Sequence, residues 1–380
     1  MKIKFEKSKM LEKLSRAMGA VSQRNTHPFT EGVLLETAED GLKLSSYDME
    51  KSVRALVEAE VILEGACVIN AQRLLSIIRI LPESVITMTV DESLLVTIQS
   101  GRSSFSLHAL PAKDFPQMPT IAGRESFTME QCALKKMILR TMHSIAQIDQ
   151  RPVLCGAYFK LTGDSVRMVT CDGCTLSMCD LQTPIVTVDK LERTSFIVPG
   201  KTITELVRML SDEPDVFITI MVTAKNIIFN MDNLVFSSRL VEGEYVDYKR
   251  LIPKDQPIEA TVDASAFTDA LERAALISEE KIAGTAKNYV KLLFVENALQ
   301  VTSKSANGNI FEEIECEHIG EDIVIGFNCR YLMNTMRAID AEKVKIKLLT
   351  PFMSTTIEPI PEEGAPDKYL YMVLPLKMKE

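Results

Sequence analysis

The feature that most constrains the fold is a threefold repeat within the 380 residues of the chain. Three segments, starting at Lys7, Glu130 and Asp263, begin with a helical pattern that places apolar residues four positions apart on one face. A second helical pattern follows in each segment, beginning at three equally spaced residues: Asn70, Pro199 and Asn328. A chance likeness of apolar patterns predicts neither this shared order nor this equal spacing. We therefore expect three similar domains.

Strand patterns lie between and after the paired helices. Residues 53–61 alternate apolar and polar side chains with a period of two, which is typical of a half-buried strand. Proline-containing stretches, "LPAKDFPQMP" and "EGEYVDYKRLIP", close the first two repeats and favour extended linkers. The expected fold is α+β, with two helices packed on antiparallel sheets in each domain. The expected domains cover residues 1–122, 126–250 and 252–380.

Composition limits the classes of function. Hydrophobic residues make up 46% and charged residues 25%, as in globular proteins, and the apolar runs are too short to span a bilayer. The N-terminal stretch "MKIKFEKSKM" lacks the apolar core of a signal peptide, so we expect a cytoplasmic protein with reduced thiols. The chain has no Walker A loop, nucleophile elbow or acidic metal-binding cluster. We expect no catalytic activity, cofactor, metal or membrane partner.

The stretch "TCDGCTLSMCD", residues 170–180, raises a different possibility, because Cys171 and Cys174 have the spacing of a redox or zinc motif. Asp172 lies as far beyond Leu134 as Asp48 lies beyond Met10, so the stretch occupies a position that recurs in the repeat. Asp-Gly is a strong signal for a two-residue hairpin turn. Zinc would need two more ligands, and the chain has only four His. We favour a structural hairpin.

Charge is distributed unevenly along the chain. Five of the six predicted helices carry a net positive charge, although the whole chain carries −9. If the helices share one side of the sheets, one surface is basic and suits a polyanion. Motifs that read bases are absent, so we expect contacts with phosphates that ignore nucleotide sequence and weaken with salt.

Four stretches together resemble the bacterial DNA sliding clamp, the β subunit of the replicative polymerase III holoenzyme: "LPAKDFPQMP", "TCDGCTL", "EGEYVDYKRLIP" and "YMVLPLKM". The resemblance covers the whole chain. It implies a head-to-tail homodimer whose domains form a ring around duplex DNA, with helices lining the pore and sheets outside. Such a clamp is a processivity factor for DNA replication. The partners implied are the replicative polymerase α subunit, the clamp loader δ subunit and other proteins with a clamp-binding motif.

The resemblance also assigns residues to three sites. DNA binding is expected of Arg24, Arg73, Arg79, Lys136, Arg140, Lys201 and Arg208. A peptide-binding pocket is expected from Leu154, Cys171, Gly173, Cys174, Thr175, Leu176, Val246, Arg250, Leu251, Met353, Thr355, Met372, Val373, Leu374, Pro375, Leu376 and Met378. The dimer interface is expected to bring Phe105 and Leu107 against Leu276 and Ile277, although these four residues also suit an ordinary core.

Two other functions fit parts of the sequence. One is a thiol oxidoreductase or zinc protein centred on Cys171 and Cys174. The other is a monomeric repeat scaffold that binds peptides but not DNA. Oligomeric state and retention on circular DNA separate both from a clamp.

Overall fold

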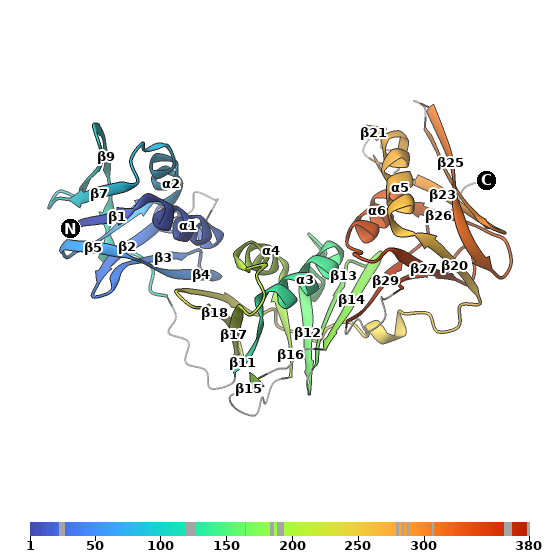
Figure 1. Cartoon of the computed structure of the whole chain (residues 1–380). Coiled ribbons are helices and arrows are strands. Elements are labelled where there is room, and N and C mark those ends of the chain that lie inside the picture. The colour runs from blue at the N-terminus through green and yellow to red at the C-terminus, as the bar shows by residue number, and fades with distance from the viewer. Residues whose placement is uncertain are drawn as a thin grey trace. The chain divides into compact units, whose positions relative to one another are not determined.

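The structure is a computed structural model that describes residues 1–22, 27–118, 126–163, 165–182, 186–187, 194–278, 281–282, 285–286, 289–305, 308–360 and 367–377 (Figure 1). The chain forms two compact units. The first contains Met1–Cys132, Ile185–Arg193 and Thr204–Leu240, and the second contains Ala133–Pro184, Thr194–Ile203 and Val241–Glu380. Each unit therefore contains a portion of the second repeat.

The first unit contains two antiparallel sheets. One has five strands, in the order β5 (Ala59–Leu63), β1 (Lys2–Glu6), β7 (Val85–Val90), β8 (Leu95–Ser100) and β9 (Ser103–His108). The other has ten strands, in the order β10 (Leu110–Pro111), β6 (Ala66–Asn70), β2 (Gly32–Ala38), β3 (Gly41–Tyr47), β4 (Lys51–Val57), β19 (Leu234–Arg239), β18 (Asn226–Met231), β17 (Phe217–Val222), β11 (Ser126–Glu130) and β15 (Val186–Thr187). The β4–β19 pair joins the first repeat to the second through backbone hydrogen bonds.

The second unit contains a twelve-stranded antiparallel sheet. Its order is β16 (Ser195–Pro199), β12 (Gly156–Thr162), β13 (Ser165–Cys171), β14 (Thr175–Gln182), β29 (Lys368–Val373), β28 (Thr355–Pro359), β27 (Lys343–Leu348), β20 (Ile258–Asp263), β25 (Gly308–Ile319), β24 (Ala298–Ser305), β23 (Tyr289–Val295) and β26 (Ile323–Asn328). A small hairpin pairs β21 (Lys281–Ile282) with β22 (Thr285–Ala286). The β14–β29 pair joins the second repeat to the third.

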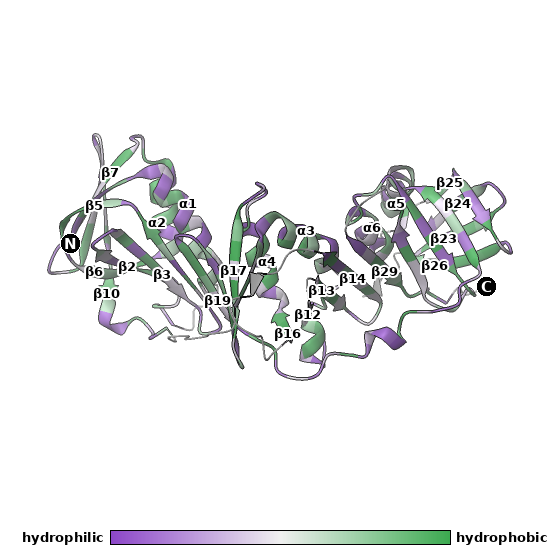
Figure 2. Cartoon of the chain, turned by 60° about the horizontal axis from the view of Figure 1, so that its bottom comes forward, coloured by the Kyte–Doolittle hydropathy of each residue, from purple (hydrophilic) through white to green (hydrophobic). Residues whose placement is uncertain are grey.

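Six α-helices occur in the described ranges, two in each repeat: α1 (Lys7–Ala17), α2 (Ala71–Ile80), α3 (Gln131–Thr141), α4 (Gly200–Met209), α5 (Ala264–Ser278) and α6 (Cys329–Arg337). On α1 the residues Met10, Leu14 and Ala17 are buried, because their spacing puts them on one face. Figure 2 shows the resulting mixture of hydrophilic and hydrophobic residues along α1 and the largely hydrophobic β17. The prediction of three repeated α+β domains is confirmed.

Asparagine caps explain why two of the second helices begin where the sequence repeat places them. The side chain of Asn70 accepts a hydrogen bond from the Arg73 backbone N–H at 3.0 Å, and Asn328 accepts one from the Arg330 N–H at 3.0 Å. Each cap satisfies a donor in the first helical turn that has no partner within the helix.

Candidate functional site

The stretch "TCDGCT" is a hairpin turn between β13 and β14. The carboxylate of Asp172 accepts hydrogen bonds from the backbone N–H groups of Cys174 at 2.8 Å and Thr175 at 2.6 Å. Gly173 has φ of +88°, a left-handed conformation that glycine adopts without strain. In the first repeat, Asp48 accepts from the N–H groups of the residues two and three positions later, so the same turn recurs without thiols. The prediction of a structural turn is confirmed.

The thiol of Cys171 lies inside the protein rather than in a reactive setting. Its side chain is buried, and burial raises the pKa of the thiol, which disfavours the thiolate needed for redox chemistry. In the described part of the chain, no group of three or more His, Cys, Asp or Glu side chains is arranged to hold a metal ion.

A buried apolar cluster lies beneath this turn. It consists of Ala146, Leu154, Val169, Cys171, Leu176, Tyr248 and Met372, which come from the second and third repeats. Val246 packs against the cluster and is only partly buried. The cluster exists because β14 pairs with β29, which sets Leu176 opposite Met372 and Thr175 opposite Val373.

The chain beyond β29 continues along the same junction. The backbone N–H of Leu374 donates to the carbonyl of Cys174 at 2.9 Å, and that of Leu376 donates to the carbonyl of Gly326 at 2.8 Å. These bonds fix an extended segment whose apolar side chains remain partly in solvent: Leu374 is 37% exposed and Leu376 is 40% exposed. We call this segment and the buried cluster the apolar seam, and we group with them Leu251 and Met353, two exposed apolar residues of the same compact unit that the sequence assigned to the pocket.

The predicted pocket residues that the structure describes belong to one compact unit and fall into two groups by burial, called here the inner and the outer layer. The inner layer is buried and comprises Leu154, Cys171, Thr175, Leu176, Thr355, Met372 and Val373. The outer layer is partly or largely exposed and comprises Gly173, Cys174, Val246, Arg250, Leu251, Met353, Leu374, Pro375 and Leu376. The side chain of Arg250 is 87% exposed and pairs with Asp247 at 2.9 Å. Met378 lies outside the described residues.

The predicted DNA-binding cations occupy different environments. Five are exposed on helices: Arg73 and Arg79 on α2, Lys136 on α3, and Lys201 and Arg208 on α4. Arg208 is paired with Glu205 at 3.1 Å, and Lys136 lies 3.9 Å from Asp340. Arg24 lies outside the described residues.

Arg140, also on α3, lies in a different environment from these five cations. Its side chain is only 9% exposed, and its guanidinium donates to Asp340 and Asp367, each at 2.9 Å. The same guanidinium stands 4.2 Å from the centre of the Tyr369 ring. Burial opposes its positive charge, but the hydrogen bonds to Asp340 and Asp367 and the charge of Asp340 outweigh burial and raise the pKa of Arg140. The Arg140 guanidinium is enclosed and already paired, unlike the five exposed cations, and its assignment to DNA binding stays a prediction.

The expected interface residues are all incompletely buried. Phe105 and Leu107 lie on β9, an edge strand, and each is partly buried. On α5, Leu276 is 83% exposed and Ile277 is partly buried. The exposure of Leu276 excludes the ordinary core role for that residue.

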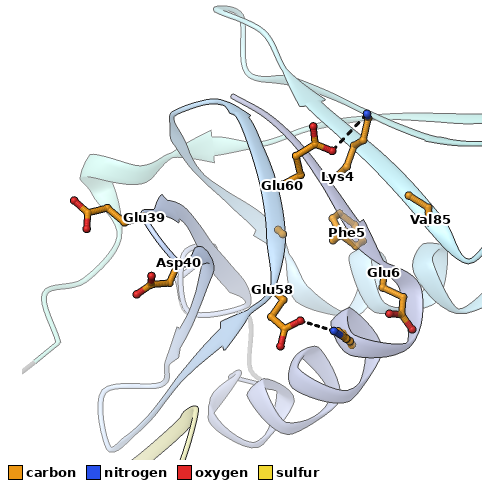
Figure 3. A pocket seen from close by; sticks show the side chains of 10 residues that line it. Lys4, Phe5, Glu6, Glu39, Asp40, Glu58, Glu60 and Val85 are labelled. Atoms are coloured by element: carbon orange, nitrogen blue, oxygen red, sulfur yellow. Dashed lines mark hydrogen bonds and ion pairs between the residues drawn. The ribbon is translucent and has the colours of Figure 1, made fainter.

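A separate hollow of about 530 Å³ lies in the first repeat, between β1, β5 and α1 (Figure 3). Five carboxylates line it: Glu6, Glu39, Asp40, Glu58 and Glu60. Two lysines also line it, and both are paired: Lys4 lies 3.5 Å from Glu60, and Lys9 bonds to Glu58. The hollow is therefore acidic and unsuited to a phosphate backbone.

Sequence reasoning missed two groups at the repeat junction. One consists of Asp340, Asp367 and Tyr369, which surround Arg140 from positions far along the chain, so no local signal reveals them. The other is a buried row of hydroxyls, in which Ser144 contacts both Thr175 at 2.9 Å and Ser177 at 2.7 Å. Its signal is the run of polar residues in strand positions that face the interior.

Comparison with known proteins identifies the repeats. Three profiles match: the N-terminal domain of the DNA polymerase III beta subunit over residues 1–119, its central domain over 128–247 and its C-terminal domain over 249–373. The beta sliding clamp of Escherichia coli is 33% identical over 382 residues, covering all of both chains. A crystal structure of the Pseudomonas aeruginosa sliding clamp bound to griselimycin is 29% identical, with a TM-score of 0.88 and full coverage of both chains. The Bacillus subtilis sliding clamp, 24% identical over the full length of both chains, has the same fold, with a TM-score of 0.89.

Three successive clamp domains and a sheet that continues across each repeat junction define the class of DNA sliding clamps. The chain belongs to the bacterial DNA polymerase III beta subunit family. It is accordingly a processivity factor for a DNA polymerase and not itself a catalyst. In the described ranges, no helix is long and apolar enough to cross a membrane.

Proposed function

We propose that two copies of this chain close head to tail into a ring around duplex DNA. The observation that carries the proposal is a pair of free sheet edges. Among the described residues, β9 pairs only with β8, and residues 308–315 of β25 pair only with β24. Exposed strand edges offer unpaired N–H and C=O groups to another chain.

The internal junctions indicate how these edges meet. Strands β9, β19 and β29 are equivalent in the three repeats. Each is the third strand after the second helix of its repeat: β9 follows β7 and β8, β19 follows β17 and β18, and β29 follows β27 and β28. Likewise, β25 follows β24 across a hairpin as β4 follows β3 and as β14 follows β13. Because β19 pairs with β4, and β29 pairs with β14, the repeat pattern predicts that β9 pairs with β25 of the partner subunit.

The same comparison predicts the register. Ser238 pairs with Lys51 at the first junction, and Val373 pairs with Thr175 at the equivalent position of the second. Transferred to the subunit junction, this register pairs Leu107 with Gly308, and therefore Ser106 with Asn309. Phe105 then lies opposite Ile310 on β25, a strand that contacts α5, the helix that carries the exposed Leu276.

DNA binding is assigned to exposed helix cations. We propose that Arg73, Arg79, Lys136, Lys201 and Arg208, with Arg24 inferred from the sequence alone, contact phosphates inside the ring. Twelve helices of roughly 10 Å diameter, side by side, enclose a bore of roughly 28 Å, which admits a duplex and a layer of water. Weak contacts suffice, because topology rather than affinity retains the ring.

The apolar seam is assigned to peptide binding. It combines a packed apolar cluster with exposed leucine and methionine side chains, which suit a short apolar segment of a partner. The proposed partners are the replicative polymerase α subunit, the clamp loader δ subunit and other proteins with a clamp-binding motif. The P. aeruginosa relative binds griselimycin, and we propose to test this compound as a competitor of peptides here.

Engineered cysteines test the ring and its register together. Ser106 and Asn309 are both exposed, and paired residues of antiparallel strands have Cα atoms about 5 Å apart, within reach of a disulfide. We expect the S106C/N309C double variant to form covalent dimers on oxidation. The S106C/F311C control shifts one cysteine by two residues and should cross-link poorly, and the wild-type chain controls for native thiols.

Topology is then read out on DNA. The S106C/N309C variant is placed on a nicked circular plasmid with a clamp loader, oxidised, and treated with detergent. A closed ring should stay with circular DNA after denaturation and be lost when the plasmid is linearised. Cross-linked protein that leaves both forms alike would contradict encirclement, as would a chain that remains monomeric at micromolar concentration.

A further inference from the structure

We propose that Arg140 is a positioning residue for peptide binding: it anchors β29 against the second repeat and so holds the apolar seam in its binding register. The inference rests on the proposed peptide site. It replaces the expected role of Arg140 as a DNA contact.

The first step is the geometry of the anchor. Arg140 projects from α3 of the second repeat, whereas Asp340, Asp367 and Tyr369 belong to the third repeat. Asp340 follows α6, Asp367 immediately precedes β29, and Tyr369 lies on β29. The hydroxyl of Tyr369 donates to Asp340 at 2.5 Å, which links the partners to one another as well as to the guanidinium. One cation therefore fixes two separate segments of the neighbouring repeat.

The second step connects the anchor to the seam. Strand β29 pairs with β14 from Lys368 to Val373, with the anchor at its beginning. Its other end delivers Met372 into the buried cluster and Leu374 to the carbonyl of Cys174. A slip of one residue would turn every side chain of β29 to the opposite face, so an anchor at one end sets which residues the other end presents.

The third step is a comparison between repeats. Arg16 and Arg273 occupy the position of Arg140 on the first helices of the other two repeats. Arg16 pairs with Glu12 on its own helix and is 32% exposed, and Arg273 pairs with Glu312 and is 52% exposed. At the β4–β19 junction, Ser52 and Ser237 share a hydroxyl hydrogen bond of 2.6 Å. Of the three arginines, only the one at the junction that carries the seam is buried between repeats.

Substitution of Arg140 by Met tests the inference, because Met keeps apolar bulk without the charge. The probe is a fluorescein-labelled peptide carrying the clamp-binding segment of a replicative polymerase α subunit, measured by anisotropy on the full chain. We expect R140M to weaken binding on the order of tenfold. R140K, which keeps a cation that can reach one carboxylate, should fall between R140M and wild type, and Y369F should weaken binding less than R140M.

A control separates positioning from general loss of stability. Leu14 is fully buried in the first repeat, and L14A destabilises the compact unit that does not contain the seam. At a temperature where all variants are folded, L14A should bind the peptide as wild type does. Hydrogen exchange in R140M should increase in residues 368–376 and not in β19.

The outcomes are distinguishable. If wild type fails to bind the peptide, the proposed peptide site fails, and this inference fails with it. If wild type binds but R140M binds equally well, only the positioning role is overturned. If R140M loses retention on circular DNA while peptide affinity is unchanged, Arg140 is a DNA contact after all.

Discussion

The backbone N–H of Leu374 donates to the carbonyl oxygen of Cys174 at 2.9 Å, which ties the C-terminal segment to a hairpin turn in the preceding repeat. Through this bond, the apolar seam, which we propose as the peptide site, includes residues from two repeats and depends on their junction. A substitution that weakens the junction is therefore expected to change the position of the side chains in the seam.

A charge introduced into the apolar seam should abolish peptide binding. L374D places a carboxylate where a partner's apolar side chain would pack, and an unpaired buried charge is costly. We expect affinity for the labelled peptide to fall by about a hundredfold. L63D introduces the same charge at a leucine that is 60% exposed in the first repeat, and it should leave peptide affinity unchanged. Equal losses in both variants would argue against a peptide site at the seam.

Reversing charge on α2 should weaken DNA binding in a salt-dependent manner. Each lost phosphate contact lowers the slope of log affinity against log salt by about 0.9. We expect the R73E/R79E variant to reduce that slope by about two contacts, as measured by titration of duplex DNA at several salt concentrations. K291E, which changes an exposed lysine on β23, is the matched control and should leave the slope unchanged.

The edge strand β9 should control dimerisation. F105D puts a charge opposite the apolar Ile310 of the partner subunit in the proposed register, so the dimer should dissociate into monomers in analytical ultracentrifugation. V85D adds a charge at an exposed residue of β7 and should remain dimeric. Peptide binding, which needs one chain, should survive in the F105D monomer.

His143 should make stability depend on pH. Burial lowers the pKa of His143 from 6.5 to about 4, and its described neighbours are the Ser177 hydroxyl and the Tyr371 ring. The folded state disfavours protonation of His143. The neutral side chain therefore makes its full contribution to the free energy of unfolding above pH 6.5, and this contribution is lost as the pH falls towards 4. The loss is at most about 3 kcal/mol.

Comparing H143Q with wild type isolates this contribution from the titration of carboxylates. Denaturant unfolding between pH 7.5 and 4, conditions chosen to bracket the window, should show a shallower decline in the free energy of unfolding for H143Q. Parallel pH curves for the two proteins would show that His143 is not the titrating group.

Removal of metal should have no effect on the thiol turn. Because Asp172 and Gly173 already account for its geometry, a chelator should leave the melting temperature unchanged, and C174S should fold normally. Metal analysis by mass spectrometry checks this directly. One zinc per chain, lost together with stability in C174S, would instead support the metalloprotein alternative.

The fold was largely predictable because its signals are local and repeated three times. Asn70 and Asn328 mark the starts of two helices. The Asp172–Gly173 turn can be recognised from its equivalence to the turn at Asp48, which has no cysteines. The site was only partly predictable. Arg140 has the sequence environment of a surface helix cation, and its burial depends on two carboxylates and a ring that meet it only when β29 pairs with β14. The domain limits stay a prediction.

The sheets that run through both internal junctions have a consequence for how the molecule can vary. Main-chain groups are the same in every residue except proline, so a joint made by them places few demands on which side chains flank it. Side chains in β4, β19, β14 and β29 can therefore be substituted while the backbone pairing of the junctions is kept. Proline is the exception: inserted at a position whose amide is shared across a junction, it would break a joint that side-chain changes elsewhere leave intact.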